Sequence, residues 1–174
     1  MADPKEHYYL VHTYPDGKLS GRLIAWITST GVDPKQVHFF LCQDRNVDCA
    51  YNSAIKLALA SDCDYFVFAD NDIGPRNMEP FWEAKADIVG VKYDTGQGSS
   101  WSEPNIIHAA LWRTHRRALE HMGAPWFRHL YNEDRTATLS CVCVPFSLKA
   151  QSKGLSLAVA GTADHTPRRP HGKV

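Results

Sequence analysis

One stretch near the middle of the chain decides the fold: Tyr65-Phe66-Val67-Phe68-Ala69-Asp70-Asn71-Asp72-Ile73-Gly74-Pro75. Its first five residues are apolar or aromatic, which is typical of a buried strand, and a Gly-Pro pair ends the stretch. Two carboxylates therefore follow the tip of a buried strand. They repel each other unless a cation or hydrogen-bond donors lie nearby, and carboxylate oxygens suit Mg²⁺ or Mn²⁺. The pattern predicts a divalent metal at Asp70 and Asp72; the alternative is a solvated acidic turn.

The segments before this stretch alternate between strand and helix patterns. We expect strands at 8–13, 37–42 and 65–69, and helices at 18–30 and from Asp44 or Asn46 to about residue 60. Three strands separated by two helices make the βαβαβ pattern of an open parallel sheet. Ligands of such sheets bind beyond the carboxyl ends of the strands. We therefore expect Thr13, residues 43–46 and residues 70–72 to meet in one crevice.

The second half of the chain continues the alternation less regularly. No internal repeat or linker interrupts it, so we predict one α/β domain over residues 1–174, with an open, mostly parallel sheet, helices on both faces and a mobile tail at 166–174. The further elements that we expect are helices at 76–85, 114–122 (capped by Thr114) and 145–153, strands at 87–93, 106–112 and 155–160, a mobile Gly/Ser loop at 94–104, an irregular segment at 129–138 and a basic tail from 161.

Composition argues against several classes of function. Lys plus Arg number 19 and Asp plus Glu number 19, so no global basic field favours nucleic acid or an anionic membrane surface. No apolar run approaches the roughly 20 residues of a membrane span. Residues 1–6 are polar and lack the apolar core of a secretory signal. We therefore expect a cytoplasmic protein with no nucleic-acid partner and no transmembrane segment.

The chain has five cysteines, an odd number that argues against a disulfide framework and for reduced thiols. Cys141 and Cys143 are separated by one residue, whereas a zinc knuckle has a gap of roughly two to four residues. No second pair of this kind exists in the sequence. Structural zinc is therefore disfavoured.

Residues 48–55 and 61–75 resemble a glycosyltransferase of the GT-A fold, family 2-like. In such enzymes an asparagine-bearing helix leads through a short acidic turn into a strand that ends in a metal-binding Asp-x-Asp motif. Here the asparagine is Asn52 and the motif is Asp70-Asn71-Asp72. Fainter similarity extends the resemblance to nearly the whole chain, through residues 109–119, 125–127, 146–155 and 161–165.

The resemblance implies a nucleotide-sugar donor, with a UDP-sugar favoured, and Mn²⁺ or Mg²⁺ as cofactor. Asp72 would ligate the metal, Asp70 would approach the metal or the ribose, and His165 would complete the coordination; the alternative for His165 is a surface histidine. The acceptor, a glycan, lipid or protein, stays open, and a partner chain, as in a homo-oligomer, could supply acceptor surface that so short a chain lacks. The residues implied at the base or ribose are Thr13, Asp44 and Asn52.

The chain departs from this family at the proton acceptor. An inverting enzyme needs a carboxylate that takes the proton of the acceptor hydroxyl. Aligned through residues 146–154, the family's acidic pair falls on Val142-Cys143, and neither side chain is an ordinary base. Three alternatives remain: Glu133 or Asp134 has taken over the role, the enzyme retains configuration without such a base, or transfer is weak or lost. We favour the first; the alternative for Glu133 and Asp134 is an exposed charged loop without a catalytic role.

Two other functions stay open. A nucleotidyltransferase would share the fold class, but residues 14–18 lack a Gly-rich phosphate loop followed by Arg and Lys. A noncatalytic nucleotide- or carbohydrate-binding module is favoured by Val142-Cys143. Two side chains carry alternatives of their own: His108 contacts an acceptor hydroxyl or satisfies a hydrogen bond in the core, and Trp101 stacks on a sugar, closes over the donor or only packs.

Overall fold

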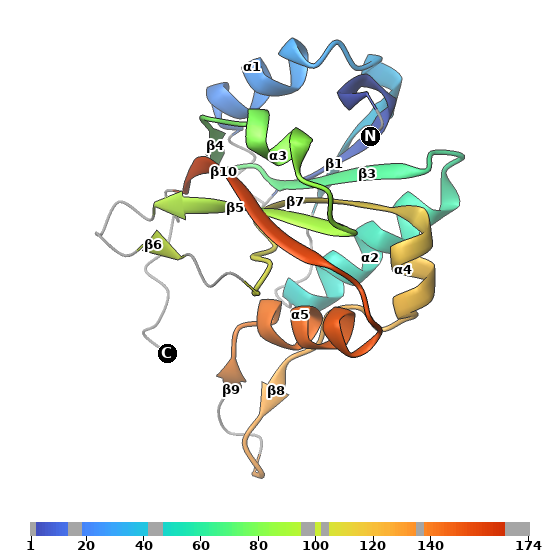
Figure 1. Ribbon diagram of the computed structural model, residues 1–174, viewed down its shortest axis with the longest axis vertical. Coiled ribbons are helices and arrows are strands. Elements are labelled where there is room, and N and C mark those ends of the chain that lie inside the picture. Colours follow the sequence, from blue (N-terminus) through green and yellow to red (C-terminus); the bar gives the residue numbers. More distant parts are fainter. Residues whose placement is uncertain are drawn as a thin grey trace.

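The computed structural model describes residues 3–13, 19–41, 47–94, 100–101, 105–134 and 138–165. A twisted sheet crosses the molecule, and helices cover both of its faces (Figure 1). The helices are α1 (Gly21–Ser29), α2 (Val47–Ala60), α3 (Glu79–Glu83), α4 (Arg116–Met122) and α5 (Cys143–Ser152), with 3-10 turns at Pro4–Glu6 and Pro34–Gln36. The strands are β1 (His7–Thr13), β2 (Val37–Leu41), β3 (Tyr65–Asp70), β4 (Ile73–Pro75), β5 (Ile88–Asp94), β6 (Ser100–Trp101), β7 (Leu111–His115), β8 (Leu130–Tyr131), β9 (Thr138–Ser140) and β10 (Leu157–His165).

Strand order in the main sheet is β2-β1-β3-β7-β5-β10-β4, and β6 also pairs with β5. β1 pairs in parallel with β2 and β3, and β10 pairs in parallel with β5. Since β7 is antiparallel to both β3 and β5, all five of those strands run in one direction. The predicted α/β fold, with a mostly parallel sheet and helices on both faces, is confirmed.

Alternate side chains of the central strand β3 fill two apolar cores on opposite faces of the sheet. Phe66 and Phe68 pack into the core under α2, α4 and α5. Val67 and Ala69 belong to the core under α1 and α3. Because both faces of this strand are covered, its sequence is continuously apolar rather than alternating.

The strand predicted at 106–112 is wrong in position, since β7 spans Leu111–His115. Residues 106–110 are apolar because they are buried, but side chains of α5 occupy two of their amides. The Ile107 amide donates to Ser147 Oγ at 2.8 Å, and the Ala109 amide donates to Cys143 Sγ at 3.4 Å. An apolar run therefore marked burial here and not strand pairing.

Other boundaries also differ from the predictions. His115, not Thr114, caps α4: its ring Nδ1 accepts the Ala118 amide at 3.2 Å. The helix expected at 76–85 is the shorter α3, and that expected at 145–153 begins earlier, with α5. The segment 129–138, expected to be irregular, contains β8, which pairs with β9. Trp101 was placed in a loop, but its backbone lies in β6; residues 95–99 and 102–104 of that loop are outside the described residues.

The carboxyl-terminal strand is longer than predicted, and a short strand next to it was missed. β10 continues to His165, where a basic tail was expected from residue 161. Gly161 adopts φ 80° and the register shifts between Val159 and Thr162, which interrupts the alternation that marks a strand. β4 has only three residues and pairs antiparallel with β10. The predicted tail at 166–174 lies outside the described residues.

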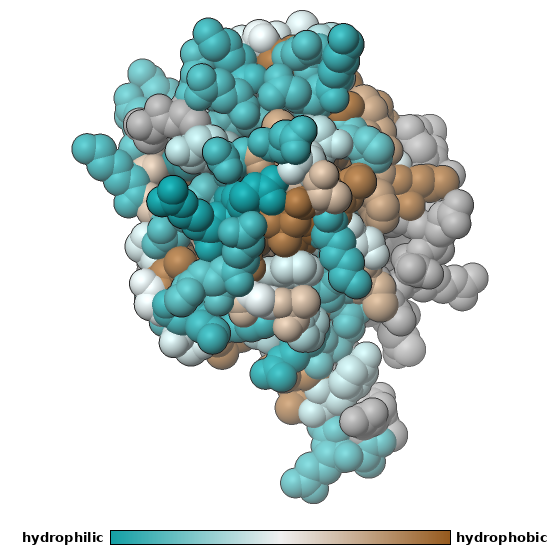
Figure 2. All heavy atoms as spheres, turned by 90° about the vertical axis from the view of Figure 1, so that its right-hand side faces the viewer, coloured by the Kyte–Doolittle hydropathy of each residue, from teal (hydrophilic) through white to brown (hydrophobic). Residues whose placement is uncertain are grey.

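β8 and β9 form an arm that projects from the body at the foot of Figure 1 and of Figure 2. On the face drawn in Figure 2, apolar residues form small groups within a mostly hydrophilic surface. Of the helices described, none has the length and apolar character needed to cross a membrane.

Candidate metal centre

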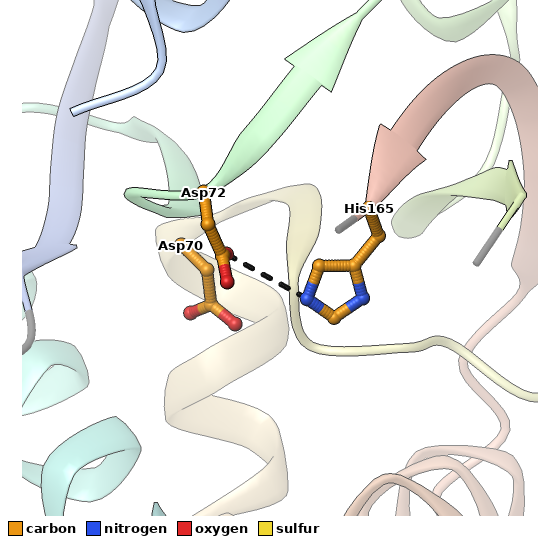
Figure 3. A group of neighbouring side chains, drawn as sticks. All are labelled: Asp70, Asp72 and His165. Carbon is orange, nitrogen blue, oxygen red and sulfur yellow. Dashed lines mark ion pairs between the residues drawn. The ribbon is translucent and has the colours of Figure 1, made fainter. Parts of the chain in front are cut away.

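Two strands deliver three potential metal ligands to one point at the carboxyl edge of the sheet. Asp70 ends β3, Asp72 follows two residues later, and His165 ends β10 (Figure 3). β4 begins directly after Asp72 and pairs with β10 so that Ile73 lies opposite His165. One ligand atom from each of the three side chains lies within 4.8 Å of the others. Among the described residues, these three form the one group of three or more neighbouring His, Cys, Asp or Glu side chains that could hold a metal ion.

Two arginines pair with Asp164, the residue before His165 at the end of β10. Arg76 Nε donates to Asp164 Oδ2 at 2.7 Å, and Arg22 of α1 pairs with the same carboxylate. The arginines are exposed, so each pair contributes little to stability. Together they link the end of β10 to α1 and to the residue that follows β4.

Asp70 is a buried carboxylate with two partners that the sequence analysis did not find. It is 5% exposed, and the Tyr51 hydroxyl lies 3.3 and 3.2 Å from its two oxygens. His12 Nδ1 lies 3.4 Å from Asp70 Oδ1. Burial raises the pKa of Asp70, the neighbouring charge of Asp72 raises it further, and His12 lowers it in part, so the net direction is upward. A cation bound next to Asp70 would stabilise the ionised form of this buried carboxylate.

Asp72 and His165 face each other across a gap. Their side chains are 12% and 13% exposed, and Asp72 Oδ1 lies 3.6 Å from His165 Nε2, too far for a hydrogen bond. Asp72 Oδ1 is buried and has no hydrogen-bond partner within the described residues. Burial lowers the pKa of His165, but the charges of Asp72 and Asp70 outweigh it and the net direction is upward. The carboxylates of Asp72 and Asp70 therefore surround the His165 imidazole with negative charge.

The donor set fits a divalent metal ion. Two ligand atoms that are each about 2.1 Å from a shared ion are at most about 4.2 Å apart, so the observed limit of 4.8 Å leaves only a small contraction. A bound ion would also satisfy the orphaned Asp72 Oδ1. Carboxylates suit both Mg²⁺ and Mn²⁺, and an imidazole is a further ligand for divalent metals. The residues present thus fit a divalent cation.

Two of the three residues expected at the nucleotide can be located. Thr13 ends β1, at the same sheet edge as Asp70, and its hydroxyl donates to the Phe40 carbonyl of β2 at 3.1 Å. Asn52 lies on α2. Asp44 lies outside the described residues. Contact of all three with a base or ribose stays a prediction.

Asn52 joins α2 to the turn after α4. Its Nδ2 donates to the Phe127 carbonyl at 2.8 Å, and its Oδ1 accepts the amides of Trp126 and Phe127 at 2.9 and 3.0 Å. Three hydrogen bonds from one amide hold this turn against the helix. The asparagine of the predicted motif therefore has a clear structural role.

Glu133 and Asp134, the predicted proton acceptors, lie in the exposed turn that follows β8. This turn belongs to the arm that points away from the sheet in Figure 1, whereas the metal centre lies at the sheet edge. The catalytic role of either carboxylate stays a prediction, and it requires the arm or the acceptor to bridge this separation.

Sequence reasoning missed three side chains around the metal centre. His12 lies opposite Asp70 in the parallel register of β1 and β3, and aligning the ends of the two predicted strands would have found it. Tyr51 lies one residue before the highlighted Asn52. The Tyr93 ring lies 5.5 Å from the ring of His108 and 5.3 Å from that of His165, between centroids. His108 is 8% exposed, and its ring packs against that of Tyr93.

A separate hollow of about 270 Å³ lies at the other end of the sheet. It includes His7 and Tyr65, the first residues of β1 and β3, so it is remote from the carboxyl ends of these strands. Asp87 in its wall is already paired with His115 Nε2 at 3.1 Å and with Ser156 Oγ at 2.6 Å. This hollow is therefore distinct from the candidate metal centre.

No family model and no curated protein matches the chain. Solved structures match by fold. The catalytic domain of Drosophila beta1,4galactosyltransferase 7 in complex with xylobiose has a TM-score of 0.60 and 16% identity, over 97% of this chain and 76% of that one. A mutant of the same enzyme in complex with manganese, UDP-Gal and xylobiose has a TM-score of 0.58 and 15% identity, over 96% and 76%.

A third match is mannosyltransferase PcManGT from Pyrobaculum calidifontis in complex with GDP-Man and Mn²⁺, with a TM-score of 0.52 and 13% identity, over 98% of this chain and 61% of that one. Identities this low show the fold alone. The chain therefore has the GT-A-like fold of these nucleotide-sugar-using enzymes.

Proposed function

We propose that this chain is a metal-dependent glycosyltransferase that moves a sugar from a nucleotide-diphosphate sugar, with a UDP-sugar favoured, to an acceptor hydroxyl. The observation that carries the proposal is the group of Asp70, Asp72 and His165 at the carboxyl edge of the sheet. Two structures with the same fold hold manganese together with UDP-Gal and Mn²⁺ together with GDP-Man. Ligands of open α/β sheets bind at this edge.

Asp70, Asp72 and His165 would hold Mn²⁺ or Mg²⁺, which when bound neutralises the charge that develops on the leaving diphosphate. Tyr51 orients the Asp70 carboxylate through its hydroxyl. The Asp70 amide donates to the Ala110 carbonyl at 2.7 Å, which fixes the backbone at the tip of β3. These contacts preorganise the carboxylate before a ligand arrives.

The donor's base and ribose would be bound by residues at the ends of the first strands, Thr13, Asp44 and Asn52. The acceptor is a glycan, lipid or protein hydroxyl, and a second copy of the chain would supply further acceptor surface. Glu133 or Asp134 would take the acceptor proton. Asp134→Asn and Glu133→Gln, made separately, test this role, and transfer rates unaffected by both changes would exclude the turn from catalysis.

The experiment that tests the proposal is a calorimetric titration of UDP and GDP with and without Mn²⁺. UDP binding should strengthen with Mn²⁺, and Asp72→Ala should abolish the metal effect while leaving the fold intact by circular dichroism. The control is Asp62→Ala, which removes an exposed aspartate before β3. Manganese dependence that is unchanged in Asp72→Ala would show that the site is wrongly assigned.

A noncatalytic nucleotide-binding module is the second candidate. Val142 and Cys143 stand at the position of the family's acidic pair, at the start of α5, and neither is a carboxylate. Both are buried, at 3% and 5% exposed. Release of free UDP from UDP-sugars separates the two candidates. An enzyme should form free UDP from a UDP-sugar faster than the same sample without protein. A binding module should bind UDP with Mn²⁺ but leave the rate of UDP formation unchanged.

A further inference from the structure

Two cysteine sulfurs lie in contact at the start of α5. The Sγ atoms of Cys141 and Cys143 are 3.1 Å apart and share a hydrogen bond. Cys141 is exposed, whereas Cys143 is 5% exposed. The Ala109 amide donates to Cys143 Sγ at 3.4 Å, so the buried sulfur is held in position by a second element.

The backbone between the two cysteines permits a disulfide. Val142 has φ −55° and ψ −21°, which is helical. Helical dihedrals at the middle residue place the flanking Cα atoms about 5.4 Å apart. A disulfide accepts Cα separations of roughly 4.4 to 6.8 Å. Closure then needs the sulfurs to move from 3.1 Å to about 2.05 Å, an approach of about 1 Å.

We propose that Cys141 and Cys143 are a redox-active dithiol that closes reversibly to a disulfide across the N-terminal boundary of α5. This modification site is independent of the proposed glycosyl transfer. It also differs from a metal site, since neither cysteine belongs to a group of three potential ligands among the residues described.

The two thiols suit different roles in this reaction, Cys141 as the attacking nucleophile and Cys143 as the resolving thiol. Their hydrogen bond lowers the pKa of Cys141 to about 6, although burial opposes this effect. The same hydrogen bond, together with burial, raises the pKa of Cys143. The exposed sulfur is thus the better thiolate at neutral pH, and thiolates are the attacking species in disulfide exchange.

The oxidant in this proposal is a small disulfide such as oxidised glutathione. The Cys141 thiolate attacks one glutathione sulfur, the glutathione disulfide bond breaks, and one glutathione leaves as a thiolate and takes a proton. Cys143 then loses its proton and attacks Cys141 Sγ, which expels the second glutathione. Two thiols lose two electrons and two protons, and one oxidised glutathione becomes two reduced molecules.

The test equilibrates the full chain with mixtures of reduced and oxidised glutathione, followed by acid quench, alkylation and peptide mass spectrometry. The peptide that contains Cys141 and Cys143 should lose two hydrogens and both alkylation sites in one two-electron transition. Cys49 and Cys63 should stay open to alkylation. Glutathione adducts on both Cys141 and Cys143, pairing of Cys141 with another cysteine, or no oxidation of the pair would each overturn the proposal.

Single variants assign the roles of the two sulfurs. Cys143→Ser should trap one glutathione on Cys141, because the resolving thiol is absent. Cys141→Ser should leave the buried Cys143 without an adduct, and this variant changes an exposed side chain, so it preserves the fold. Cys49→Ser is the matched control and should leave the transition unchanged. A Cys141→Ser variant in which Cys143 is glutathionylated as readily as Cys141 is in Cys143→Ser would contradict the assignment.

Discussion

Replacement of Asn52 by alanine should destabilise the protein by about 2 to 3 kcal/mol. The change removes the partners of two amides and one carbonyl in the turn of Trp126 and Phe127, whose side chains are 5% and 1% exposed. Each buried group without a partner costs about 1–3 kcal/mol. Water can reach these groups in part, so we use the low end, about 3 kcal/mol in total. The better helix propensity of alanine offsets roughly 0.5 kcal/mol.

Urea denaturation, followed by circular dichroism and tryptophan fluorescence, measures this loss. The midpoint should fall with an unchanged slope, because the surface exposed on unfolding stays the same. Ser53→Ala is the matched control: it changes the next, exposed residue of α2 and should alter stability by less than about 0.5 kcal/mol. A loss for Asn52→Ala no larger than that of the control would refute the reasoning.

Three further predictions concern the backbone, the response to acid and the metal centre. Gly161→Ala should destabilise the chain more than Gly31→Ala in urea denaturation, because both have positive φ but only the Cβ at 161 would meet a backbone oxygen, at 2.8 Å; equal losses would contradict this. Burial lowers the pKa of His7 to about 4, while the unfolded chain takes up this proton near about pH 6.5. Stability should therefore be full above that pH and fall by up to about 3 kcal/mol as the pH drops to 4; His7→Phe should flatten this fall, and an unaltered slope would count against it. Tyr51→Phe removes the hydroxyl next to Asp70 and should weaken Mn²⁺ binding roughly tenfold in calorimetry; wild-type affinity would show that the hydroxyl does not orient the carboxylate.

The centre of the fold was predictable from the sequence because its strands are covered on both faces. β3 is an uninterrupted apolar run, and its end at Asp70 followed from the change to polar residues. The helix α2 was predictable from its period, with Ala54 and Ala58 buried on one face. In these segments the local pattern and the tertiary packing require the same residues.

The parts that were missed depend on contacts between distant segments. β4 has three residues, too few to show a period, and it exists because β10 pairs with it. Residues 106–110 look like a strand because burial alone makes them apolar, while Ser147 and Cys143 occupy their amides. The approach of His165 to Asp72 follows from the β4–β10 register, so only the family resemblance suggested it.

The most direct test of the metal centre is a crystal soaked with UDP and Mn²⁺, with data collected at a wavelength where manganese scatters anomalously. We expect one strong anomalous peak within coordination distance of Asp72 and His165, beside Asp70 and in contact with the diphosphate. Nucleotide density without a peak at these three residues, or manganese bound elsewhere with the three side chains unchanged, would contradict it.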